Sequence, residues 1–311
     1  MKIIKELKNF VKNAKNPLIV LLGPTASGKT DLSLKLAKDF DCEIISTDSR
    51  QIYKGLEIGS DILPENKRKK IPHHLLQITS PDKPLTLAQY TELALGKIKD
   101  IHERKKIPML VGGTGLYISA IIEGYKVPKV APNMALREKL HHQAAEKGNE
   151  YVHKQLAKLD PKAAKKIHPN NLRYVIRAIE IIKATKKKKS SLKKEPKYDI
   201  FMLGIDRPRA QLYKRIEKRV DKQIKNELLK EVKALLKKKY DLSLPAMSSL
   251  GVKELIPHIL EKAPLDECIK ILKRNTRRYA KRQMTWFRKY INVNWLNAED
   301  LDQWLKKASK K

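Results

Sequence analysis

The stretch "GPTASGKT" at residues 23–30 stands directly behind the apolar run "LIVLL" at residues 18–22. It matches G-x-x-x-x-G-K-[ST], a loop whose backbone N–H groups surround phosphate oxygens at the start of a helix. The apolar run predicts a buried strand, and "TDLSLKLAKDF" behind the loop predicts that helix. We therefore expect a fold that binds a compound with linked phosphates. The motif does not distinguish ATP from another diphosphate.

Further strand patterns predict a parallel sheet around this loop. They occur at "EIIST" (43–47) and "IPMLV" (107–111), and residues 85–106 between them have helical apolar spacing. The strand pattern returns at "YDIFMLGID" (198–206) and "NVNWL" (292–296). Strands that alternate with helices in this way predict an α/β fold of the phosphate-loop NTPase type, with a parallel sheet core.

Strand signals disappear between residues 128 and 197, where the apolar spacing is helical throughout. We expect an inserted, all-helical subdomain at 128–197. The core would then consist of residues 1–127 and 198–311, with long basic helices at about 208–239 and 264–290.

The charge balance predicts a polyanionic partner. The chain has 68 Lys and Arg residues against 34 Asp and Glu residues, a formal net charge of +34. Such a field attracts nucleic acid, the commonest cellular polyanion. The alternative is a lysine-rich composition that decorates every surface, and the run "KATKKKKSSLKK" at 183–194 fits either interpretation. We expect a monomer, because a protein this basic repels its own copies.

Cysteine content and hydropathy bear on the compartment. Only Cys42 and Cys268 occur, and we expect both to be buried small apolar residues without a disulfide. The longest apolar runs are strand-sized and fall short of the roughly 20 residues of a membrane-spanning helix. Residues 1–16 predict a short amphipathic helix whose lysines interrupt any signal-peptide core. We expect a cytoplasmic protein that does not bind membranes.

Two segments follow predicted strands at the edge where parallel sheets bind ligands. Asp48, in "STDSRQIYKGLEIGS" at 46–60, can be a magnesium ligand, a helix cap or a general base. Gly112 and Gly113, in "GGTGLY", permit close backbone approach to a ligand or serve as plain turn residues. No acidic residue closes the strand at 107–111, where a phosphate-loop hydrolase usually keeps its magnesium-binding Asp. This omission weakens the ATPase hypothesis.

Four segments together resemble the tRNA dimethylallyltransferases, prenyltransferases that modify the adenosine next to the anticodon. They are "GPTASGKT", "DSRQIYKGLEIGS", "GGTGLY" and "AKRQMTWFR" (280–288), accompanied by "PHHLL" at 72–76. The likeness runs in order from about residue 17 to residue 296. It implies that a dimethylallyl group passes from dimethylallyl diphosphate to the exocyclic N6 amine of a flipped adenine, with release of diphosphate.

The resemblance assigns three residues to the reaction. Asp48 matches the general base, Thr114 a residue near the reacting adenine, and Arg219 a second contact to the diphosphate. The alternatives are a helix cap for Thr114 and a solvated helix charge for Arg219. Magnesium is the expected cofactor, held by Thr30. The expected diphosphate contacts are Gly23, Thr25, Ala26, Ser27, Gly28, Lys29 and Thr30.

The resemblance also implies a surface for the anticodon arm of tRNA. Asp48 to Gln51 are expected to line the flipped base, with the Gln51 amide reading an adenine edge. Trp286 and Phe287 could stack on bases, although such residues in a helix are more often core. The expected tRNA contacts are Asp48, Ser49, Arg50, Gln51, Thr114, Arg137, Arg173, Arg177, Gly251, Lys253, Lys281, Arg282, Gln283 and Arg288.

Two departures from the family pattern lie in these RNA-binding segments. Val252 stands where the family usually has Tyr, and Arg173-Tyr174 stands where a Gln-Arg or Arg-Arg pair is common. The diphosphate residues match the family, so the sequence predicts the reaction type better than the RNA preference.

Three other functions fit parts of the sequence. An adenylate isopentenyltransferase shares the loop and the chemistry but prenylates a free nucleotide. A small-molecule kinase would use the loop for ATP, and a non-catalytic RNA-binding protein would consume nothing. The predicted helical insertion, the segment "KRQMTWFR" and the charge of +34 favour RNA over a small nucleotide.

Overall fold

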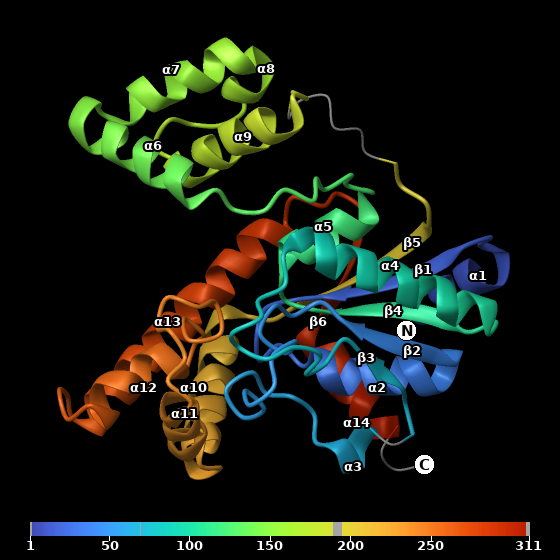
Figure 1. Ribbon diagram of the computed structural model, residues 1–311. Coiled ribbons are helices and arrows are strands. Elements are labelled where there is room, and N and C mark those ends of the chain that lie inside the picture. Colours follow the sequence, from blue (N-terminus) through green and yellow to red (C-terminus); the bar gives the residue numbers. More distant parts are fainter. Residues whose placement is uncertain (1, 69, 189–194, 309–311) are drawn as a thin grey trace. The chain divides into compact units, whose positions relative to one another are not determined.

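The sheet in the computed structural model has six strands, all parallel, in the order β3-β2-β4-β1-β5-β6 (Figure 1). The structure describes residues 2–68, 70–188 and 195–308. The predicted parallel α/β core is confirmed. Its strands are β1 (Pro17–Leu22), β2 (Cys42–Ser46), β3 (His73–His74), β4 (Ile107–Gly112), β5 (Asp199–Asp206) and β6 (Val293–Asn297).

Strand β1 lies in the middle of the sheet, between β4 and β5. Ile19 pairs with Met109 on one side and with Phe201 on the other. All side chains from Leu18 to Leu22 are fully buried, because helices cover both faces of the sheet at this point. The loop behind β1 therefore emerges at the carboxyl edge of the sheet, where parallel α/β proteins bind their ligands.

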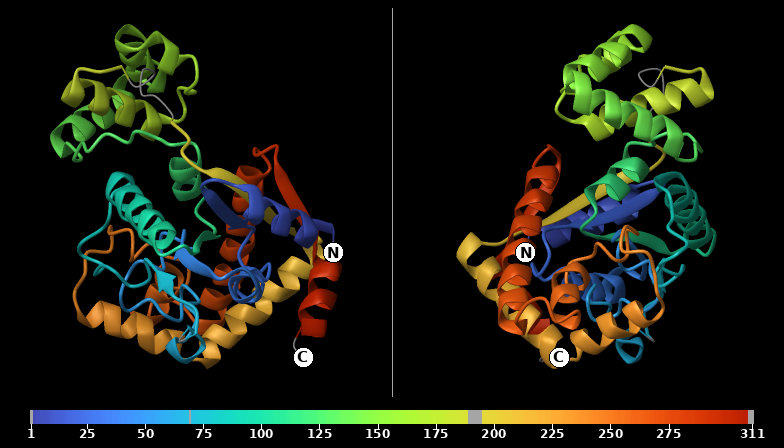
Figure 2. Two further views of the ribbon diagram at one scale, coloured as in Figure 1. Left: turned by 90° about the vertical axis from the view of Figure 1, so that its right-hand side faces the viewer. Right: turned by 60° about the vertical axis from the view of Figure 1, so that its left-hand side comes forward.

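Helices α1 (Lys2–Asn13), α2 (Lys29–Phe40) and α14 (Ala298–Ala308) pack on one face of the sheet. Figures 1 and 2 show α4 (Leu87–Glu103) on the opposite face from α2 and α14. This division follows the alternation of side chains along the strands. The cluster on the first face contains Leu7, Ile19, Leu21, Leu32, Leu36, Leu203, Ile205 and Leu301.

The remaining helices of the core are α3 (Glu65–Arg68), α5 (Gly115–Ile122), α10 (Arg209–Lys225), α11 (Leu228–Lys237), α12 (Val252–Ile259) and α13 (Leu265–Phe287). The long helix expected at 208–239 is two helices, α10 and α11. The break lies at Glu227, whose φ of 70° is left-handed and ends the run of helical hydrogen bonds. The turn brings Leu228 to a fully buried position.

The cysteines and the helix lengths can also be described. Cys42 and Cys268 are free and buried, because each packs as a small apolar side chain. No described helix has both the length and the apolar content that crossing a membrane requires.

The chain divides into two compact units. The sheet-containing unit holds Met1–Thr86, Tyr90–Ile122 and Lys197–Lys311, and the second unit holds Leu87–Gln89 and Glu123–Pro196. The elements of the second unit are helices; the sequence pattern placed the limits of the helical subdomain at 128 and 197. Its helices are α6 (Met134–Lys147), α7 (Asn149–Leu159), α8 (Pro161–Ala164) and α9 (Leu172–Thr185).

A buried carboxylate lies at the centre of the helical unit. Glu180 is 1% exposed and accepts hydrogen bonds from Arg137, from Arg177 and from the backbone N–H of Asn133. Burial alone would raise the pKa of Glu180, but these donors lower it to about 2. The structure thus gives Arg137 and Arg177, which were expected to contact tRNA, an internal partner. Arg173 is exposed and lies over the ring of Tyr174.

The Arg137→Ala substitution should destabilise the helical unit by about 1–3 kcal/mol, because it leaves part of a buried charge without its donors. Arg173→Ala on α9 is the matched control and should change stability by less than about 0.5 kcal/mol. Amide hydrogen exchange in α6 and α9 measures both effects. Equal exchange in Arg137→Ala and Arg173→Ala would contradict the assignment of Arg137 as a partner of Glu180.

The depressed pKa of Glu180 stabilises the fold above pH 4.5, and this contribution should disappear as pH falls toward 2.

Candidate active site

The loop between β1 and α2 has the backbone of a phosphate-binding turn. Gly28 precedes α2 with a φ of 109° and a ψ of 16°, in the left-handed region that glycine adopts without strain. Lys29 and Thr30 form the first turn of α2, where backbone N–H groups have no partner within the helix. These groups, together with the positive end of the helix dipole, can bind an anion.

Lys29 closes the loop from within. Its Nζ donates hydrogen bonds to the carbonyl oxygens of Gly23 and Pro24, each at 2.9 Å. The net pKa of Lys29 is lowered to about 8, chiefly because the side chain is buried; the charge of Arg219 also lowers it, and the carboxylates of Asp48 and Asp61 oppose the shift. The lysine therefore shares one electrostatic environment with Asp48 and Arg219, although both residues are far from it in the sequence.

Three arginines hold the phosphate loop from the outside. Nη1 of Arg219, on α10, donates to Thr25 Oγ1 at 2.9 Å and lies 3.2 Å from Asp61 Oδ2. Nε of Arg215 donates to the carbonyl of Ala26 at 2.8 Å. Nε of Arg207, directly after β5, donates to the carbonyl of Ser27 at 3.2 Å. The guanidinium of Arg219 thus lies beside the loop and does not point into solvent.

Asp48 lies just beyond the end of β2, close to the loop behind β4. Its Oδ1 accepts a hydrogen bond from the backbone N–H of Arg50 at 2.9 Å. The Thr114 hydroxyl oxygen accepts from the N–H of Ser49 at 3.0 Å, which ties the two loops together. Burial raises the pKa of the Tyr279 phenol, and Asp48 raises it further. Asp48, Thr114 and Tyr279 therefore form one half-buried cluster.

Two predicted tRNA contacts have side-chain amides that are already engaged. Oε1 of Gln51 accepts from Ser46 Oγ at 2.8 Å, and its Nε2 donates to the carbonyl of Ser60 at 3.1 Å. The amide keeps one lone pair and one hydrogen for a base edge. Gln283 is only 5% exposed, and both ends of its amide bind backbone groups of the two loops. Direct RNA contact by Gln283 is therefore corrected to an internal role.

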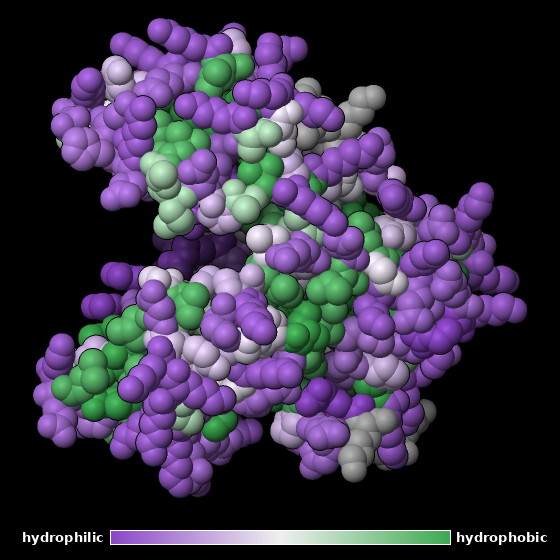
Figure 3. Space-filling model, in the orientation of Figure 1, coloured by the Kyte–Doolittle hydropathy of each residue, from purple (hydrophilic) through white to green (hydrophobic). Residues whose placement is uncertain are grey.

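The other predicted tRNA contacts of the core divide by exposure. Lys253, Lys281, Arg282 and Arg288 have exposed side chains. Gly251 is buried, and its N–H donates to Glu254, so its expected RNA contact is not available on the surface. Figure 3 shows hydrophilic residues over most of the visible surface, as a charge of +34 requires.

The structure also shows the surroundings of Val252, one of the two sequence departures, and of the neighbouring aromatic residues Trp286 and Phe287. Val252 is fully buried, so this position offers no side chain to a ligand. Phe287 is fully buried in the core. Trp286 packs against Gly115 and donates its indole N–H to Ser119 Oγ at 3.3 Å. The structure therefore supports the core interpretation for Phe287, whereas Trp286 is only half-buried.

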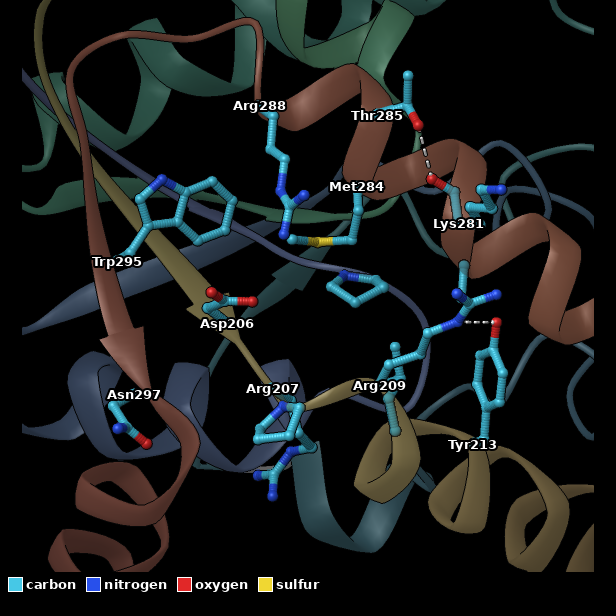
Figure 4. Close-up of a pocket in the computed structure, with 14 residues that line it drawn as sticks. Asp206, Arg207, Arg209, Tyr213, Lys281, Met284, Thr285, Arg288, Trp295 and Asn297 are labelled. Carbon is cyan, nitrogen blue, oxygen red and sulfur yellow. Dashed lines mark hydrogen bonds between the residues drawn. The ribbon is translucent and has the colours of Figure 1, made fainter.

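A cavity of about 630 Å³ opens beside the phosphate loop (Figure 4). Pro24 contributes to its wall, and Figure 4 shows Trp295, Arg288 and the Asp206 carboxylate pointing toward it. The cavity has an apolar lining with cations around it. Neither Asp48 nor Thr114 lines it, so it is separate from the cluster around the candidate base.

Sequence reasoning missed Arg207 and Arg215. Arg207 directly follows a strand, so the rule that ligands bind at the carboxyl edge of a parallel sheet could have identified it. Its guanidinium is also paired with Asp302 of α14 through two hydrogen bonds of 2.9 Å. Arg215 is one cation among many on α10, and no sequence signal separates it from its neighbours.

The phosphate loop offers hydroxyl groups to a magnesium ion. The Ser27 hydroxyl is buried without a hydrogen-bond partner, and the exposed Thr30 follows three residues later in the chain. Among the described residues no group of three His, Cys, Asp or Glu side chains could hold a metal ion. Magnesium commonly keeps several waters and binds through substrate phosphates with few protein ligands. The hydroxyl groups of the loop fit a magnesium ion of that kind.

Comparison with known proteins gives a consistent result. A sequence model of the IPP transferase family matches residues 51–290. The tRNA dimethylallyltransferase of Halothermothrix orenii is 50% identical over 285 residues, which cover 90% of this chain and 87% of that protein. The corresponding protein of Acetivibrio thermocellus is 46% identical, with 92% and 93% covered.

Solved structures agree. The tRNA isopentenylpyrophosphate transferase of Bacillus halodurans is 38% identical, with a TM-score of 0.68, and the match covers 95% of this chain and 99% of that one. A eukaryotic dimethylallyltransferase described as acting on tRNA is 30% identical, with a TM-score of 0.82, and the match covers 95% and 77%.

The lowered pKa of Lys29 predicts how binding of inorganic diphosphate depends on pH. Lys29 is charged below about pH 8, so affinity should fall as pH rises above that value, by up to about tenfold per pH unit. Lys29→Met should bind more weakly and lack this decline. The ratio of the wild-type and variant affinities, measured by calorimetry from pH 6.5 to 9.5, cancels the ligand's own titration. A ratio that is constant over this range would contradict the assignment.

Proposed function

Because the chain belongs to the IPP transferase family, we propose that it transfers a dimethylallyl group from dimethylallyl diphosphate to tRNA. The acceptor is the exocyclic N6 amine of the adenosine that follows the anticodon, and the products are N6-(dimethylallyl)adenosine in tRNA and diphosphate. The protein is thus a tRNA-modifying prenyltransferase. Relatives named for this activity match more than 90% of the chain at 46% identity.

The observation that carries this proposal is the position of Asp48 next to the phosphate loop, which Lys29 and Arg219 contact and which Gln283 joins to Gly113 beside Asp48. An anion-binding loop lies beside a carboxylate that makes no ion pair within the described residues. Allylic transfer needs both features, because the amine, which loses a proton, attacks the same carbon that the diphosphate leaves. A kinase would also use cations and a carboxylate, so the choice of prenyl transfer rests on the family relationship.

The reaction uses these groups in the following way. The N6 amine attacks the allylic carbon, the carbon–oxygen bond to diphosphate breaks, and Asp48 accepts the proton that the amine loses. Lys29, Arg219 and the N–H groups at the start of α2 stabilise the negative charge that gathers on the diphosphate. Thr114 fixes Ser49, the neighbour of Asp48, and so holds the base in place.

Magnesium fits the oxygen-rich end of the loop. Thr30 would hold the ion, with the unpartnered Ser27 hydroxyl close in sequence. When bound, the ion neutralises phosphate charge as a Lewis acid. Arg219, which donates to Thr25 Oγ1, would stabilise the same phosphate charge.

The tRNA anticodon arm is the proposed macromolecular substrate, bound by a monomeric protein in the cytoplasm. Exposed cations on α13 and α12 support this choice, because a free nucleotide requires no extended basic surface. On this view Lys281, Arg282, Arg288 and Lys253 contact phosphates, and Arg173 does so on the helical unit. Arg50, whose guanidinium donates to the carbonyl of Pro245, braces the loop next to Asp48.

Asp48→Asn should reduce prenyl transfer by roughly 10²–10⁴-fold, because the amide keeps the shape but cannot accept the amine proton. Affinities for tRNA and dimethylallyl diphosphate should remain within a few-fold. The exposed Asp82→Asn is the matched control and should retain full activity. Formation of N6-(dimethylallyl)adenosine in digested tRNA gives the rate.

The same assay separates the alternatives. Prenylation of AMP at a rate equal to that of tRNA would favour an adenylate isopentenyltransferase. Normal turnover by Asp48→Asn would remove Asp48 from its proposed role without affecting the family assignment.

Lys281→Ala should flatten the slope of log affinity for tRNA against log salt by about 0.7–0.9, the contribution of one phosphate contact. The exposed Lys8→Ala on α1 is the control and should leave the slope unchanged. The single-turnover rate at saturating tRNA should change by less than about tenfold in both variants. Identical slopes in wild type and Lys281→Ala would show that Lys281 is solvated in the complex.

A further inference from the structure

One side chain of α13 joins the two loops of the candidate active site. Oε1 of Gln283 accepts a hydrogen bond from the backbone N–H of Thr25 at 2.8 Å. Nε2 of the same amide donates to the carbonyl of Gly113 at 3.0 Å. Thr25 belongs to the phosphate loop and Gly113 to the loop behind β4, so the amide spans the gap between them.

The site around this amide is tightly built. Gln283 is 5% exposed, and a Cβ placed on Gly113 would lie 2.1 Å from its Nε2. An alanine at 113 therefore cannot coexist with the bridge. The bridge thus explains why position 113 needs a glycine, apart from any need of the turn. The same Cβ would lie 4.0 Å from Asp48 Oδ2, so the bridge ends next to the candidate base.

The chemistry of the bridge requires an amide. Thr25 offers a donor and Gly113 an acceptor, and a carboxamide presents one of each at its tip. A glutamate would accept from Thr25 but oppose the Gly113 carbonyl with negative charge. An alanine would leave both buried backbone groups without these partners.

Each end of the bridge leads to a group with a proposed role. Thr25 Oγ1 accepts a hydrogen bond from Arg219. The phosphate loop is therefore joined to the residue that we propose as a diphosphate contact. Gly113 precedes Thr114, whose hydroxyl accepts from Ser49 next to Asp48. The distance between leaving group and base is therefore set by residues attached to both ends of Gln283.

We propose that Gln283 is a positioning residue for prenyl transfer, which fixes the phosphate loop relative to the loops that carry Thr114 and Asp48. It touches neither the diphosphate nor the amine. The proposal rests on the proposed function, because it assigns the two loops to the two reactants. An error of about 1 Å between reacting groups can cost on the order of 100-fold in rate.

Gln283→Ala and Gln283→Glu should lower kcat by about 10–100-fold. Affinity for tRNA should stay within twofold, because the side chain is buried and makes no RNA contact. Weaker tRNA binding with a normal single-turnover rate at saturating tRNA would overturn the proposal and restore Gln283 as an RNA contact. A wild-type rate in both variants would also overturn it.

The glycine provides an independent variant for a double-mutant cycle. Gly113→Ala should lose rate like Gln283→Ala, because its methyl group displaces the amide. In the double variant the space is vacant, so the rate should be no lower than in either single variant. Multiplicative losses would overturn the bridge, because they would mean that position 113 acts on substrate directly. Gly96→Ala, with no atom within 4 Å of the new methyl group, is the control.

A measurement without substrate separates this proposal from the proposed function. The Thr25 amide should exchange slowly with solvent in the wild-type protein and at least tenfold faster in Gln283→Ala, as measured by NMR. Equal exchange in both proteins would overturn the bridge even if tRNA is prenylated. Absence of prenyl transfer by the wild type would contradict the proposed function, and the exchange result would still decide the bridge.

Discussion

The phosphate loop turns its carbonyl oxygens toward cations of the protein. Lys29 binds the carbonyls of Gly23 and Pro24, and two arginines bind those of Ala26 and Ser27. Because the carbonyls are engaged in this way, the N–H groups at the start of α2 remain for an anion. In the proposed reaction, the same cations would stabilise the charge that gathers on the departing diphosphate. Binding and activation of the leaving group would then depend on one set of contacts.

A site this rich in cations must still leave the proposed base, Asp48, able to accept a proton. Arg219 meets this condition because its ion-pair partner is Asp61, at 3.2 Å, and not Asp48. Asp48 is held by a backbone N–H and by the loop joined to Thr114. Gln283 connects these two environments without adding charge to either. The proposed diphosphate contact and the proposed base therefore do not form an ion pair with each other, while Gln283 joins the loops that carry them.

Much of this organisation could be predicted from local sequence. The run at 18–22, the glycines of the loop and the placement of Asp48 follow from strand and turn chemistry, which acts between near neighbours. The partners of Arg137 and Gln283 could not be predicted, because each contact joins residues that are distant in sequence: Arg137 to Glu180, and Gln283 to Thr25 and Gly113. An exposed and a buried cation on one basic helix have the same sequence signature. Only packing distinguishes them.

The central claim is that the phosphate loop holds a prenyl diphosphate as leaving group and does not hydrolyse a nucleotide. The most direct test measures diphosphate, orthophosphate and modified nucleoside together, with wild-type protein, tRNA and dimethylallyl diphosphate, in the presence and absence of ATP. The account predicts one diphosphate for each N6-(dimethylallyl)adenosine formed and no orthophosphate from ATP. Hydrolysis of ATP stimulated by tRNA, without prenylated adenosine, would contradict it.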